Sequence, residues 1–145
     1  MRGLLIAFEG LDQSGKQTQA ELLRDRLKQA GHKARLVSFP DYGTSIGEEL
    51  ARALQGERDF GPDVMQLLYV ANRYERKPDL ERWLGGGLIL VCDRYERDLA
   101  MQARVRDSYQ RQAQVQGWVV FDGERSKEVI AADVISAVAS RLGLP

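Results

Sequence analysis

The residues best suited to chemistry lie near the start of the chain, in Gly10-Leu11-Asp12-Gln13-Ser14-Gly15-Lys16-Gln17-Thr18. Two glycines separated by four residues and followed by lysine permit a tight loop whose main-chain amides point inward. A loop of this kind at the start of a helix attracts phosphate groups, because its amides and the helix dipole present positive charge. We therefore predict that residues 10–18 bind the phosphates of a nucleotide, with Lys16 reaching the β- and γ-phosphates.

One position departs from the usual pattern of such loops. The residue after the lysine normally carries a hydroxyl that binds Mg²⁺, and here it is Gln17. Thr18 comes one residue later, about 100° further around the helix, so its hydroxyl points elsewhere. A direct bond from either side chain to the metal is disfavoured, and a contact from Gln17 through water is the better prediction.

The segments on either side of this loop decide whether it binds phosphate. Residues 4–8 form an apolar run that is too short for a helix and suits a buried strand. Residues 16–30 carry leucines on one side and charges on the other, which predicts a helix that ends at Gly31. The order of strand, loop and helix favours a phosphate site over the alternative, a glycine-rich turn that binds nothing.

The rest of the chain alternates between short apolar runs and longer amphipathic segments. Strands are predicted over residues 34–39, 88–93 and 118–121, and helices over residues 45–54, 62–85, 98–116 and 130–142. The second helix is expected to start with a capping box at residues 45–48. This alternation predicts an α/β fold, a parallel sheet with helices on both faces. Ligands bind such sheets beyond the carboxyl ends of the strands, where Gly10, Phe39, Asp93 and Asp122 would lie.

Composition narrows the class of protein. The 145 residues suit a single domain, and 21 basic residues balance 21 acidic ones, so no net charge favours nucleic acid or an anionic membrane. No apolar run is long enough for a membrane span, and no signal peptide precedes the first strand. The single Cys92 fits a reducing compartment, so a cytoplasmic location is expected.

Four segments together resemble the thymidylate kinase family, nucleoside monophosphate kinases of the P-loop class. They are Phe8-Glu9-Gly10-Leu11-Asp12 continuing into Ser14-Gly15-Lys16, Phe39-Pro40 with residues 43–47, residues 67–75, and Asp93-Arg94-Tyr95. The resemblance implies a three-layer α/β/α fold of the P-loop NTPase type. It also implies transfer of the γ-phosphoryl group of ATP–Mg²⁺ to dTMP, which gives dTDP for dTTP synthesis.

The resemblance assigns roles at the phosphate end of the site. Lys16 and the loop amides would bind the ATP phosphates, and Asp93 would organise Mg²⁺ at the end of its strand. Arg94 resembles the family's clamp on the acceptor phosphate, which suits a planar guanidinium. Asp12 resembles a loop carboxylate that approaches the sugar or phosphate of dTMP. The catalytic set implied is therefore Lys16, Asp93 and Arg94.

The resemblance also assigns residues to the thymine. Tyr69 and Arg73 are spaced i, i+4, so one helical face presents both. Tyr69 resembles the aromatic that stacks on thymine and Arg73 the residue that hydrogen-bonds its exocyclic oxygen, while Phe39 would border the same pocket. Without the resemblance, Tyr69 would be assigned to the core and Arg73 to the surface.

The chain departs from the family pattern after Asp93-Arg94-Tyr95. Residues 93–98 run directly into residues 99–101, which resemble sequence that in the family follows the lid, so a helix, a strand and the lid between two similar motifs are missing. We predict a single domain over residues 1–145 that is internally shortened near residues 94–98. The strand at residues 118–121 would then move beside the first strand, giving four strands in the order 2-3-1-4.

Loss of the lid is expected to affect function more than fold. Water would reach the site and arginines of the transition state would be lost, so ATP binding should persist while dTMP phosphorylation weakens. Two alternatives remain open: a nucleotide-binding module that does not turn over, and a deoxynucleoside kinase. The family resemblance further implies a homodimer packed through helices.

Overall fold

The structure is a computed structural model that describes residues 3–10, 15–94 and 119–143. Its elements in chain order are β1 (Leu4–Phe8), α1 (Lys16–Gln29), β2 (Ala34–Phe39), α2 (Ser45–Leu54), α3 (Pro62–Gly85), β3 (Ile89–Arg94) and α5 (Lys127–Leu142). The predicted starts of α1, α2 and α3 are confirmed. β3 begins one residue later than predicted, because the amide of Leu88 still closes the end of α3 on Trp83 O. The helix predicted over residues 98–116 lies outside the described residues.

The three strands form a parallel sheet in the order β1-β3-β2. In this register Asp93 of β3 lies opposite Phe8 of β1 and Ser38 of β2, and Arg94 lies opposite Phe39. Since all three strands run in the same direction, their carboxyl ends meet at one edge of the sheet. Phe8, Phe39 and Asp93 therefore lie at the same edge of the sheet, as the sequence predicted.

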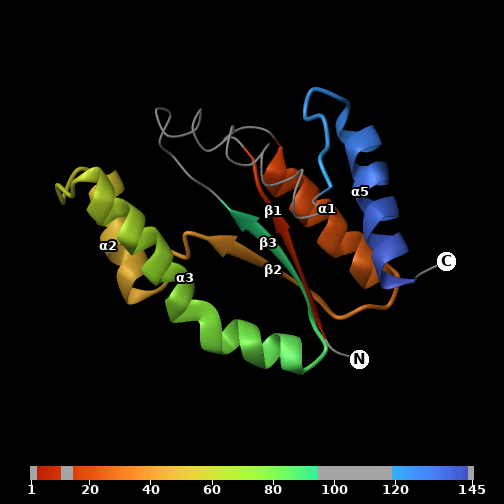
Figure 1. The fold of residues 1–145 in the computed structure, drawn as a ribbon, viewed down its shortest axis with the longest axis horizontal. Helices are drawn as coiled ribbons and strands as arrows, with labels where there is room; N and C mark the ends of the chain where they lie inside the picture. Colours follow the sequence, from red (N-terminus) through yellow and green to blue (C-terminus); the bar gives the residue numbers. More distant parts are fainter. Residues whose placement is uncertain (1–2, 11–14, 95–118, 144–145) are drawn as a thin grey trace.

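Helices cover both faces of the sheet, which confirms the predicted three layers (Figure 1). On one face α1 and α5 pack over β1 and β3 in a core of aliphatic side chains that includes Leu23, Val91 and Ile130. On the other face Leu90 and Cys92 pack with Trp83 and other residues of the second half of α3. The central strand β3 is buried on both sides, which explains its almost continuous apolar sequence.

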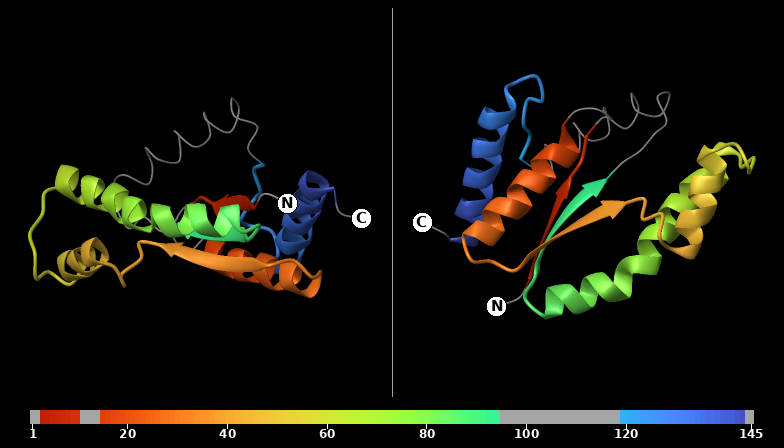
Figure 2. Two further views of the ribbon diagram at one scale, coloured as in Figure 1. Left: turned by 90° about the horizontal axis from the view of Figure 1, so that it is seen from below. Right: turned by 180° about the vertical axis from the view of Figure 1, so that it is seen from behind.

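Helix α3 has two parts with different roles. Pro78 lies inside it, where a missing amide hydrogen bends a helix, and the two halves run in different directions in Figures 1 and 2. The second half covers the sheet, whereas the first half extends beyond it and packs on α2. The first half, which carries Tyr69 and Arg73, contacts the loop that joins β2 to α2 through Asn72.

The predicted fourth strand is wrong for the part of it that the structure describes. Residues 119–121 form no strand, and Trp118 lies outside the described residues. The side chains of Val119 and Val120 are 54% and 74% exposed, while Phe121 packs against the core that α1, α5 and the sheet share. A strand needs a neighbour for its backbone hydrogen bonds, and residues 119–121 have none in this part of the chain. Only the partial order 2-3-1 is confirmed.

Among the described residues, every helix is too short or too polar to cross a bilayer.

Candidate functional site

The phosphate loop is anchored at both ends by described residues, while residues 11–14, including Asp12, lie outside the described part. Gly15 adopts φ 83°, the left-handed region that glycine tolerates, and its carbonyl accepts the first hydrogen bond of α1 from the amide of Gln19 at 3.0 Å. The Lys16 ammonium turns back and donates to the carbonyl of Gly10 at 2.7 Å. The positive charge therefore lies across the opening between the two ends of the loop.

Asp93 lies at the tip of β3 and is only 9% exposed. Burial raises the pKa of its carboxyl, the charge of Lys16 acts in the opposite direction, and Glu21 and Glu9 raise it further. Its Oδ1 has no hydrogen-bond partner among the described residues. A buried carboxylate with an unused oxygen beside the loop lysine is an arrangement that a bound cation would complete.

The described residues can be compared with the donor set that Mg²⁺ usually takes in proteins. Within residues 3–10, 15–94 and 119–143, no three side chains of His, Cys, Asp or Glu converge as metal ligands. Mg²⁺ commonly takes one or two carboxylates and completes its coordination with phosphate oxygens and water. Asp93 fits that donor set in company with a nucleotide.

Gln17 and Thr18 occupy the first turn of α1. The Gln17 amide donates to the carboxylate of Glu21 at 3.0 Å on the exposed side of the helix, and Thr18 is half-buried. This hydrogen bond runs along the helix surface, and a contact from Gln17 to a metal stays a prediction.

The described residues assigned to the acceptor nucleotide come from three elements, α3, β2 and β3. Tyr69 and Arg73 are half-buried and one turn apart on the first half of α3. Phe39 is 7% exposed and packs with Val37 and Leu90, so its ring belongs to the core beneath the loop. The backbone of Arg94 lies opposite Phe39 at the end of β3.

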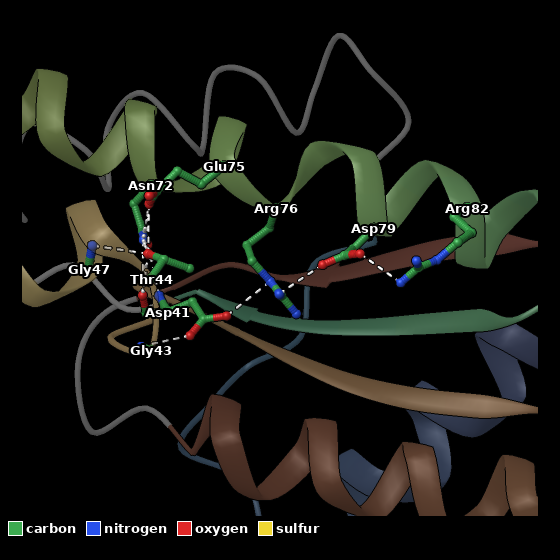
Figure 3. A network of polar contacts seen from close by, with 9 residues as sticks. All are labelled: Asp41, Gly43, Thr44, Gly47, Asn72, Glu75, Arg76, Asp79 and Arg82. Carbon is green, nitrogen blue, oxygen red and sulfur yellow. Dashed lines mark hydrogen bonds and ion pairs between the residues drawn. The ribbon is translucent and has the colours of Figure 1, made fainter.

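Polar residues that were not predicted to be functional join α3 to the loop between β2 and α2 (Figure 3). The side chain of Asn72 is completely buried and pairs with the backbone of Asp41: its Oδ1 accepts from the Asp41 amide at 2.8 Å, and its Nδ2 donates to the Asp41 carbonyl at 3.0 Å. Nδ2 also donates to Thr44 Oγ1 at 2.8 Å. A fully buried Asn in a helix fixes the β2–α2 loop to α3.

Glu75 completes the network one turn along α3. Its carboxylate accepts from the Thr44 hydroxyl at 2.6 Å and from the Ile46 amide at 3.1 Å. Burial opposes ionisation, but hydrogen bonds from Thr44, Ile46 and Asn72 outweigh it and lower the pKa of Glu75 below its usual value. Glu75 is therefore a charged acceptor that holds the first turn of α2.

The Asp41 side chain extends the network along α3. Its Oδ2 lies 3.0 Å from Arg76 Nε, and Arg76 in turn pairs with Asp79 at 2.9 Å (Figure 3). The guanidinium groups of Arg35 and Arg76 lie 4.0 Å and 5.4 Å from the centre of the Trp83 ring. A cavity of about 200 Å³ lies beside this cluster and includes Pro40 and Tyr42 in its lining, but not Lys16, Asp93 or Tyr69.

Gly47 of α2 lies close to the backbone of the loop that joins β2 to α2. A Cβ at this position would lie 1.8 Å from the Asp41 carbonyl oxygen, so the loop backbone would have to move. We expect Gly47→Ala to lower the free energy of unfolding by about 1–3 kcal/mol in urea denaturation. Gly85→Ala is the matched control, because a Cβ there has open space, and equal loss in both variants would contradict the prediction.

Comparisons with known proteins point to one family. The family model described as thymidylate kinase matches residues 8–98. The human thymidylate kinase is 44% identical over 94 residues, which are 65% of this chain and 44% of that protein. The thymidylate kinase of Plasmodium falciparum is 38% identical over 94 residues, covering 65% of this chain and 45% of the relative. The matched part thus spans less than half the length of these relatives.

Solved structures give the same family. A thymidylate kinase from Candida albicans superposes with a TM-score of 0.59 and 37% identity, over 65% of this chain and 40% of that one. A thymidylate kinase from Ehrlichia chaffeensis shares the fold at 22% identity, with a TM-score of 0.76 over 95% of this chain and 99% of that chain. The family model covers well over half of the present sequence, and the chain belongs to the thymidylate kinase family.

Proposed function

We propose that this chain binds ATP with Mg²⁺ and transfers the γ-phosphoryl group to dTMP, which yields dTDP. The observation that carries the proposal is the position of Lys16 and Asp93 at the joined carboxyl ends of the strands. There a charged lysine spans the loop, and a buried carboxylate keeps an unused oxygen. Family membership supports a nucleotide as the substrate class.

The chemistry requires positive charge around the transferred group and little covalent help. Lys16 would exchange its hydrogen bond with Gly10 for the β- and γ-phosphates, and residues 10–18 would bind those phosphates through their amides. Asp93 would hold Mg²⁺, with Gln17 reaching it through water. The metal supplies charge neutralisation at the phosphate oxygens.

The acceptor side of the proposal uses residues from four segments. Tyr69 would stack on thymine and Arg73 would hydrogen-bond its exocyclic oxygen, as their shared face on α3 supports. Arg94 and Asp12 would bind the phosphate and sugar of dTMP. Phe39 would support the pocket from below, because its own ring is buried.

A coupled assay of ADP release tests the proposal, with dTMP, dUMP, thymidine or no acceptor. We expect release that depends on dTMP and requires Mg²⁺. Release that is equal without an acceptor, or greater with thymidine than with dTMP, would contradict the proposed function.

A prediction follows at Tyr69. We expect Tyr69→Ala to raise the KM for dTMP by roughly 10- to 100-fold, because base–aromatic stacking is lost, and to leave the affinity for ATP unchanged. Tyr69→Phe keeps the ring and is the matched control. Steady-state kinetics on each substrate make the measurement, and an equal loss of ATP affinity would assign Tyr69 to the core.

The proposal includes a single domain over residues 1–145 that is shortened near residues 94–98. Two observations support it: the family match ends at residue 98, and Ile130 and Val134 of α5 nevertheless share a core with α1. Accordingly, ATP binding is expected to persist while phosphorylation of dTMP is weak, since the site admits water.

The proposal also covers assembly and location. Helix α3 exposes Leu67 (69%), Val70 (40%) and Tyr74 (67%) along one stripe. Such a stripe supports a homodimer packed through helices, which light scattering on the purified protein would test. The single, buried Cys92 thiol supports a cytoplasmic location.

A further inference from the structure

We infer that Asn72 is a positioning residue for dTMP: it fixes the β2–α2 loop against the face of α3 that carries Tyr69 and Arg73. The inference rests on the proposed function and deepens it, because it concerns the pocket wall rather than any contact with substrate. Asn72 lies three residues after Tyr69 and one before Arg73.

The pairing between Asn72 and Asp41 is bidentate. One side-chain amide satisfies both the N–H and the C=O of a single loop residue, at 2.8 Å and 3.0 Å. Two bonds to one peptide unit define the orientation of the loop as well as its distance from the helix. They use the backbone of Asp41, so the loop is fixed whichever side chain that position carries.

Thr44 and Glu75 make this arrangement rigid. The Thr44 hydroxyl accepts from Asn72 and from the Gly47 amide, and it donates to Glu75 at 2.6 Å. Each polar atom of the Asn72 side chain is thereby paired in a site without solvent exposure. The loop cannot shift on α3 without leaving several buried groups without partners, which is costly.

The fixed loop sets the geometry of the pocket. Asp41 follows the Phe39-Pro40 pair directly, and Phe39 ends β2 opposite Arg94. Asn72 thus connects the end of the sheet, where the phosphates would meet, to the part of α3 that would hold the base. A nucleoside monophosphate must contact both at once, so its affinity depends on their separation.

Asn72→Asp and Thr44→Val test the inference with little change in volume. Asn72→Asp removes the two donors and Thr44→Val removes the hydroxyl, while Thr44→Ser restores it as the conservative rescue. Lys77→Gln, on the exposed surface of α3 outside the network, is the matched control. We measure KM and kcat for dTMP and for ATP, the Kd of dTMP by calorimetry, and hydrogen exchange of the Asp41 and Ile46 amides.

We expect both loss variants to raise the KM and Kd of dTMP by about tenfold, with the KM of ATP changed by less than about twofold. Exchange at Asp41 should accelerate in Asn72→Asp, and Thr44→Ser and Lys77→Gln should behave as the wild type. Faster exchange with an unchanged Kd for dTMP would overturn the inference, as would equal losses for both substrates. Failure of the proposed function is distinct, because the wild-type protein itself would then not bind dTMP.

Discussion

Replacing Lys16 with alanine is expected to abolish measurable ATP binding and to lower any turnover by on the order of 10²–10³-fold. The ammonium is the one described cation that spans the loop, 2.7 Å from the carbonyl of Gly10. Without it, phosphates would enter beside the buried carboxylate of Asp93 with less positive charge to offset the repulsion. The loss of ATP affinity should therefore exceed the loss that follows from removing a single neutral hydrogen bond.

Calorimetry with ATP–Mg²⁺ and a thermal shift titration make this measurement. Lys28→Ala is the matched control, because Lys28 is an exposed lysine in the last turn of the same helix. Lys16→Arg keeps the charge but not the compact ammonium, and we expect it to recover only part of the affinity. Unchanged heats of binding in Lys16→Ala would show that the loop does not bind phosphate through this residue.

The elements of this fold could be predicted because their signals are local. The apolar run of β3, the amphipathic period of α1 and the glycine after it depend only on neighbouring residues. The start of α2 shows the limit of that accuracy: a capping box was predicted to begin at Ser45, but the cap is Thr44, whose hydroxyl accepts from the Gly47 amide at 3.0 Å.

Features that depend on distant partners could not be predicted in the same way. The Asn72–Asp41 pairing joins residues 31 positions apart, and no periodicity in the sequence indicates which loop a buried Asn will meet. The predicted strand at residues 118–121 failed for a related reason. An extended, β-branched run becomes a strand only beside another strand, and Val119 and Val120 are instead exposed.

In the candidate site, too, some features could be predicted from local sequence patterns and others depend on distant partners. Lys16 was identified by the glycine-loop pattern after the first predicted strand and Asp93 by its place at the end of another, and the parallel register brings those strand ends together. The shared face of Tyr69 and Arg73 followed from helical spacing alone. Their relation to the sheet did not, since it depends on the bend at Pro78 and on the loop fixed by Asn72.

Asp93→Asn is expected to stabilise the protein without nucleotide while it lowers phosphoryl transfer by on the order of 10²–10³-fold. Burial raises the pKa of Asp93 despite the nearby charge of Lys16, so the ionised carboxylate is less favourable in the folded protein than in the unfolded chain. A neutral amide of the same shape removes that cost. Function and stability thus make opposite demands on this position.

The direction of this stability difference can be tested by measuring it as a function of pH. The Asp93 carboxyl holds its proton more tightly in the folded protein than in the unfolded chain, where its pKa is 3.8. The stability that this group contributes therefore falls as the pH rises above 3.8 and through the raised pKa. The melting temperature of Asp93→Asn should therefore exceed that of the wild type at pH 7, and the difference should shrink toward pH 4. Asp122→Asn, in an exposed turn, is the control for loss of a carboxylate.

Addition of ATP–Mg²⁺ should make the melting temperature of the wild type higher than that of Asp93→Asn. The wild type gains stability from a ligand that binds only the folded state, whereas the variant lacks the carboxylate proposed to hold the metal and should gain little when Mg²⁺ replaces EDTA. A variant that is less stable than the wild type at pH 7 would show that attraction to Lys16 outweighs burial. An equal Mg²⁺-dependent gain in both proteins would remove Asp93 from the metal site.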